Sequence, residues 1–72
     1  MTREYTVIIE KGPTSWGAYV PDLPGCAAAG RTEAEVRRLI REAIALHLED
    51  MAESRKRIPV PRSHAELVAV TA

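Results

Sequence analysis

Apolar and polar residues alternate along the first part of the chain. Apolar side chains recur at every second position in Tyr5, Val7 and Ile9. A period of two is typical of a strand with one face toward a core, so the pattern predicts a strand over about residues 4–11, with Ile8 as an unexplained apolar residue on the other face. Turn-forming residues at 11–15 separate this run from a second alternating run, Trp16–Val20, which together predict a hairpin.

A rigid turn follows the hairpin. The stretch Pro21-Asp22-Leu23-Pro24-Gly25 holds two prolines and a glycine in five residues, which fixes two φ angles and permits a positive one. The next residues, Cys26–Ala29, are predicted as a third short strand. Alanine alone would favour a helix here, but Gly30 and the helix-start signal behind it favour the strand.

The longest element predicted is an amphipathic helix that begins at residue 33. Thr32 and Glu35 have the spacing of a capping box, and Glu33 and Glu35 favour the positive end of a helix. At about 100° per residue one side collects the apolar stripe and His47. The stripe comprises Val36, Leu39, Ile40, Ala43, Ile44, Leu46, His47 and Met51. The helix is therefore expected to make about five turns.

After the helix, Ile58-Pro59-Val60-Pro61 imposes extended geometry and is expected to form a crossover. The apolar, partly β-branched run Leu67–Thr71 is predicted as a final strand, parallel to an earlier one. The expected fold is thus α+β, in the order β-β-β-α-β, as one domain over residues 1–72. One sheet face and the strand edges stay open, and Trp16 and Tyr19 lie on opposite faces, so one aromatic is a potential interface anchor.

Charge and composition exclude several classes of function. Ten basic and ten acidic residues give a net charge of zero, which disfavours direct DNA or RNA binding. One cysteine and two histidines allow neither an internal disulfide nor a usual zinc site. No apolar run approaches the roughly 18 residues of a membrane span and no signal-peptide pattern opens the chain, so a cytoplasmic protein is expected. A core of this size supplies only about 3–5 kcal/mol, so we expect a homodimer or homotetramer.

No converging catalytic groups are evident, and neither an enzyme nor a cofactor is predicted. Cys26 is more consistent with a small packing residue than with a nucleophile. The position of His47 in the apolar stripe favours a core or interface histidine with a hydrogen-bond partner over a catalytic one. His64 is expected to be exposed. The basic run Arg55–Arg57 is expected to complement the end of the helix, with an acidic partner surface as the alternative.

Two motifs in order resemble a known family. The stretch Tyr19–Cys26, followed by Gly30–Glu35, resembles the signature of HicB-type antitoxins, in which a strand leads to a V-P-D-L-P-G-C turn and then to G-D-T-x-E-E-A at the helix start. Ile58–Pro61 is similar to the I-P-x-P of that family. The chain departs from the pattern at Arg31, where Asp is frequent, and at Val36, where Ala is usual. The resemblance implies a degenerate RNase H-like fold without its catalytic acids.

The resemblance also implies a partner. HicB-type antitoxins neutralise HicA, a small toxin that is similar in fold to double-stranded-RNA-binding domains and cleaves mRNA with a histidine. Many members carry an added C-terminal segment that binds operator DNA. Because this chain stops at Ala72, we expect the short form of the family, without that segment and without direct DNA binding.

We therefore predict an antitoxin that occludes a HicA-type toxin. The stiff turn is the predicted contact surface, through Tyr19, Pro21, Asp22, Leu23, Pro24 and Gly25. A purely structural role for this turn is the alternative. The competing functional hypothesis is an orphan homo-oligomeric scaffold that keeps the fold without a toxin. Residual nuclease activity through Glu10 or Glu66 is the third and weakest hypothesis.

Overall fold

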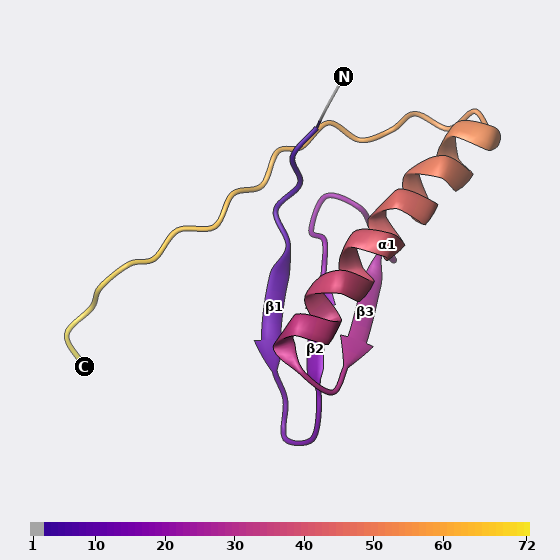
Figure 1. The fold of residues 1–72 in the computed structure, drawn as a ribbon. Helices are drawn as coiled ribbons and strands as arrows, with labels where there is room; N and C mark the ends of the chain where they lie inside the picture. Colours follow the sequence, from indigo (N-terminus) through magenta and orange to yellow (C-terminus); the bar gives the residue numbers. More distant parts are fainter. Residues whose placement is uncertain (1–2) are drawn as a thin grey trace.

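Three short strands form one antiparallel sheet, and one long helix lies across a face of it (Figure 1). In the computed structural model, which describes residues 3–72, the chain runs through β1 (Ile8–Lys11), β2 (Trp16–Tyr19), β3 (Ala27–Gly30) and α1 (Glu33–Glu53). The strands lie in the order β1-β2-β3. The predicted α+β class, the three-stranded meander and the long helix are confirmed.

The register of the strands separates the two faces of the sheet. Ile9 lies opposite Ala18, and Ala18 lies opposite Ala28, on the face that α1 covers. Neighbouring side chains of a strand point to opposite faces, so Ile8 and Tyr19, which also pair, lie on the uncovered face. The buried core is small and lies between the sheet and the helix: Ala18, Val20, Leu23, Cys26, Val36 and Ile40.

Each strand has four residues, so the predicted strand over 4–11 was too long. Residues 4–7 are extended but have no strand to pair with, because β2 ends at Tyr19, just before the turn at Pro21. The third strand is shifted by one residue, because Cys26 belongs to the turn: its carbonyl accepts the Val20 N–H at 3.1 Å.

The helix starts where the capping box predicts. Thr32 is the N-cap, and its side-chain oxygen accepts the backbone N–H of Glu35 at 3.0 Å. The Glu35 carboxylate reaches back one residue further than expected and accepts the N–H of Arg31 at 2.7 Å. Two backbone N–H groups at this end therefore have side-chain partners.

The prediction of the apolar stripe was wrong for one residue. Leu46 is 66% exposed, whereas Leu48, outside the predicted stripe, packs against the core. The stripe centres on Val36 and Ile40, which are buried, and Leu46 lies furthest from this centre around the helix. His47 is half-buried near the centre of the stripe, as predicted.

The helix is followed by a residue whose backbone has the left-handed conformation. Ser54 is the C-cap, and Arg55 follows with φ of 56°. The N–H of Lys56 bonds the carbonyl of Met51 at 2.9 Å, and that of Arg55 bonds the carbonyl of Ala52 at 3.2 Å. These two bonds form a Schellman motif, in which the left-handed position is usually glycine.

The predicted final strand over residues 67–71 is not formed. After α1 the described chain contains no further helix or strand, and residues 64–72 are extended and exposed. Residues 58–63 lie beside residues 3–6, after which the chain runs away from β1 (Figure 1). The predicted extended segment at residues 58–61 is therefore present, but it leads to no strand in the sheet, so the predicted crossover is not completed.

Within residues 3–72, no helix combines the length and the apolar character that a membrane crossing requires.

Candidate partner-binding surface

The turn between β2 and β3 is closed by its own backbone. The N–H of Leu23 bonds the carbonyl of Val20 at 3.1 Å, and the N–H of Cys26 bonds the carbonyl of Leu23 at 3.0 Å. Gly25 has φ of 84°, a conformation that costs a glycine little. Leu23 and Val20 point into the core, where they are 0% and 2% exposed. The turn is therefore anchored from inside and has a defined shape.

Asp22 fastens the segment after the helix to this turn. One carboxylate oxygen accepts the backbone N–H groups of Arg62 and Ser63, both at 2.8 Å, and the other accepts the Ser63 hydroxyl at 2.9 Å. These donors, first the backbone N–H of Ser63 and then that of Arg62, lower the pKa of Asp22 from its ordinary value of 3.8. The carboxylate therefore stays ionised and serves as a clasp for the chain at Arg62–Ser63.

A second set of contacts holds the same segment on its other side. The hydroxyl of Tyr5 donates to the carbonyl of Pro59, and that of Thr6 donates to the carbonyl of Ser63. Arg3 donates to the carbonyls of Ile58 and Pro59 at 3.4 Å. Residues 58–63 are thus fixed between the start of the chain and the turn.

Part of the uncovered face of the sheet is apolar. Tyr19 pairs with Ile8 on one side and with Ala27 on the other, which places the three side chains in one row across the sheet. Tyr19 is 44% exposed. Ile8, whose position the sequence did not explain, is thus part of this apolar row, in which it is half-buried. We call Ile8, Tyr19 and Ala27 the outer row.

The six residues predicted as the contact surface divide into two groups. Tyr19, Pro21, Pro24 and Gly25 are exposed. Leu23 is fully buried and Asp22 is occupied by the segment after the helix, so these two shape the turn from behind. The four exposed residues adjoin the outer row, because Tyr19 is itself part of that row. Sequence reasoning predicted Tyr19 as a contact but missed Ile8 and Ala27 of the outer row, although the apolar residue at position 8 of an alternating strand was a signal for it.

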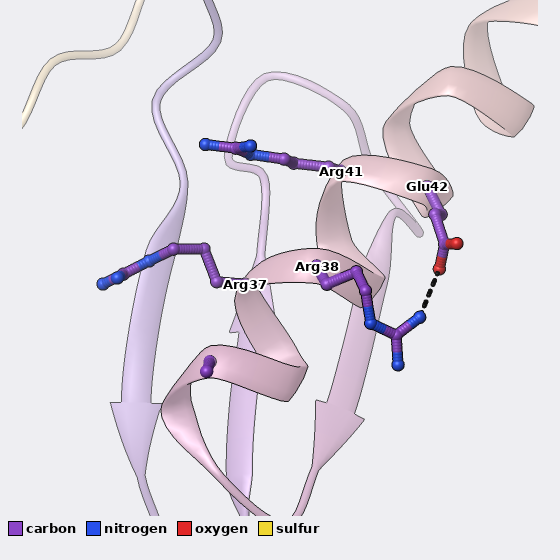
Figure 2. Close-up of a pocket in the computed structure, with 5 residues that line it drawn as sticks. Arg37, Arg38, Arg41 and Glu42 are labelled. Atoms are coloured by element: carbon purple, nitrogen blue, oxygen red, sulfur yellow. Dashed lines mark hydrogen bonds and ion pairs between the residues drawn. The ribbon is translucent and has the colours of Figure 1, made fainter.

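A shallow hollow of about 430 Å³ lies on the exposed side of α1, outside the outer row, and is lined by Ala34, Arg37, Arg38, Arg41 and Glu42 (Figure 2). Arg37 pairs with Glu33 at 2.7 Å, and Arg38 pairs with Glu42 at 3.3 Å. Such exposed pairs one turn apart contribute only about 0.3–0.5 kcal/mol each. This charged surface is typical of a solvated helix face.

A second hollow, about 290 Å³, lies between Asp22 and the segment after the helix. Its lining comprises Asp22, Arg57, Ile58, Pro59, Val60 and Arg62. The carboxylate of Asp22 is already bonded to Arg62 and Ser63 here, and the surrounding charges are basic.

The remaining candidate residues form no reactive group. Cys26 is 4% exposed in the core, and its burial raises the pKa of the thiol, which makes it a poor nucleophile. The packing interpretation of Cys26 agrees with this position. His64 is exposed, as predicted. In the part of the chain that the structure describes, no group of three or more histidine, cysteine and acidic side chains is placed to hold a metal ion.

Comparison with known proteins places this arrangement in a family. Residues 5–71 match the model of the HicB-like antitoxins of bacterial toxin–antitoxin systems. The chain belongs to this family. The match includes the turn, the helix and the segment after it, in agreement with the motifs of the sequence. The partner implied by the family is a toxin, and the role implied is binding.

Relatives come from archaea, bacteria and a phage. A UPF0150 protein of Thermoplasma acidophilum is 39% identical over 70 residues, covering 96% of this chain and 99% of its own. A UPF0150 protein of Helicobacter pylori is 43% identical over 44 residues, 61% of each chain. An uncharacterized 14.9 kDa protein from the rep-hol intergenic region of Haemophilus phage HP1 is 40% identical over 55 residues, 76% of this chain.

The chain spans less than half of the phage relative, because the match covers 41% of that protein. No solved structure matches the chain. The RNase H-like relationship therefore stays a prediction.

Proposed function

We propose that this protein neutralises a HicA-type, mRNA-cleaving toxin in the cytoplasm by binding it in a fixed ratio and covering its active surface. The observation that carries the proposal is the match of residues 5–71 to the antitoxin family. The exposed surface of the rigid turn supports it, because a preshaped surface loses little conformational entropy when a partner docks.

The contact surface proposed for the toxin consists of the turn and the outer row. Tyr19 is the central residue, because it belongs to both and because a part-exposed tyrosine offers apolar area with a polar end. Pro21, Pro24 and Gly25 flank it with exposed backbone and ring atoms. Asp22 and Leu23 take part indirectly, by holding the turn in its shape.

Binding can be tested with a HicA-type protein, taken from beside the gene for this chain where the neighbouring reading frame encodes one. The Tyr19→Asp variant places a charge in the outer row and is expected to weaken toxin binding at least tenfold, as measured by calorimetry, while circular dichroism stays unchanged. Leu46→Asp is the matched control, because Leu46 is exposed on the helix away from the turn. Equal effects of the two variants would exclude Tyr19 as the contact.

The orphan scaffold remains the second candidate function, and the apolar outer row favours it as well. An exposed apolar face on a small domain also suits a further copy of the same chain. Failure of the chain to bind the neighbouring toxin, together with stable self-association, would favour this function over the first.

A further inference from the structure

The last residues of the chain are apolar but lie in water. Leu67 is fully exposed, and Val68 and Val70 are 70% and 79% exposed. Within residues 65–72 the only charged side chain is that of Glu66. Both faces of an extended chain would be apolar here, since Leu67 lies on one side and Val68 and Val70 lie on the other. Such an apolar segment is expected to be covered by protein rather than to stay in water. We call residues 64–72 the tail.

The direction of the tail is set by the contacts before it. The carboxylate of Asp22 and the hydroxyl of Thr6 both bond Ser63, one from each side. Beyond Ser63 the tail leads away from β1 of its own chain (Figure 1). The tail is therefore fixed at its base and pointed outward.

The sheet has an open edge that lacks a strand. In the order β1-β2-β3, β1 is an edge strand, and α1 packs less closely over β1 than over β2 and β3. Val7 and Ile9, on the covered face beside this edge, are only half-buried. A strand added along β1 would receive its backbone hydrogen bonds and would cover these two side chains.

We propose that two copies of this chain exchange tails, so that residues 65–71 of each copy form a fourth strand along β1 of the other. Both halves of the contact are present in every copy, so the exchange is reciprocal and closes as a two-fold dimer. The tail is also part of the domain, because the family match extends to residue 71. This proposal is independent of the toxin.

A cross-linking experiment distinguishes the possible positions of the tail. The full chain would carry Cys26→Ala, to remove its own thiol, together with Val70→Cys in the tail and Glu10→Cys on β1. A short bis-maleimide is expected to give a product of twice the 7.9 kDa chain mass. An internally linked single chain, or no link, would overturn the exchange. Ala45→Cys in place of Glu10→Cys is the control on the exposed side of α1 and should not link.

The self-association itself has a second test. Light scattering of the unaltered chain at micromolar concentration should give twice the chain mass. Val68→Asp with Val70→Asp should raise the dimer dissociation constant at least tenfold, while circular dichroism stays unchanged because neither residue belongs to the core. Leu46→Asp should leave the dimer intact. A stable monomer of the unaltered chain, or a tail that pairs only after toxin is added, would contradict the proposal.

Discussion

Asp22 is the residue on which the arrangement after the helix depends most. Its carboxylate joins a turn and a segment some forty positions apart through three hydrogen bonds, two of them to backbone N–H groups. The sequence showed that this position carries an acid in a stiff turn, but it could not show the acid's partners. Contacts between residues far apart in sequence depend on the folded path of the chain, which local patterns do not encode.

The hydrogen bonds that the Asp22 carboxylate accepts from Arg62 and Ser63 should depend on pH. The pKa of Asp22 is lowered in the folded chain. The contribution of Asp22 to the stability of the fold is therefore complete above the ordinary pKa of 3.8 and is lost as the pH falls through the lower pKa of the folded chain. The protection of the Arg62 and Ser63 amides from hydrogen exchange, relative to the intrinsic rate at the same pH, should therefore fall when the carboxyl is protonated. Asp22→Asn should give faster exchange at both amides already at neutral pH, whereas Asp50→Asn on the helix should not. Unchanged protection in Asp22→Asn would contradict the clasp.

Gly30 is required for a close approach rather than for a special backbone angle. A Cβ atom at this position would lie 3.0 Å from the backbone nitrogen of Val36 and 2.9 Å from the Glu35 carboxylate. Gly30→Ala is therefore expected to destabilise the fold by about 1–3 kcal/mol in urea unfolding. Gly17→Ala is the control, because its nearest neighbour is 4.0 Å away. Similar losses for both variants would show that packing behind the cap is not the cause.

For the elements, the start of α1 and its approximate length were predictable, but the structure of its C-terminal cap was not. Thr32 and Glu35 form the capping interactions that their spacing indicates. The end relies on Arg55 in a left-handed conformation, a position for which glycine would have been the sequence signal. The strands were predictable in kind and order, but their lengths depend on which residues find a partner.

The strained helix end leads to a stabilising substitution. Arg55 is the one described residue other than glycine with a positive φ, and an L side chain there costs about 1–2 kcal/mol. Arg55→Gly should therefore raise the free energy of unfolding by about 1 kcal/mol. Lys56→Gly, one position later and outside the left-handed region, should give no gain. A loss of stability in Arg55→Gly would mean that the side chain of Arg55 contributes more than its backbone costs.

At the scale of the whole molecule, sequence patterns located the turn but not the full surface around it. The predicted surface includes the buried Leu23, whose position follows from the turn folding back onto the core, and it omitted Ile8 and Ala27 of the outer row. The missing fourth strand has a similar cause. The pattern of residues 67–71 predicted a strand, but these residues form none in the structure, because pairing requires an edge and the contacts of Ser63 direct this segment away from β1 of its own chain.

The central claim is that this chain acts by covering a toxin, in a fixed ratio, rather than by catalysis. The most direct measurement is a titration, with the purified full chain, of the mRNA cleavage by the HicA-type toxin that the proposed function requires. We predict that cleavage falls linearly and stops when the two proteins reach a fixed small-integer ratio, at which a stable complex elutes. Undiminished cleavage at a large excess of this chain would contradict the account, as would inhibition at a trace, substoichiometric amount.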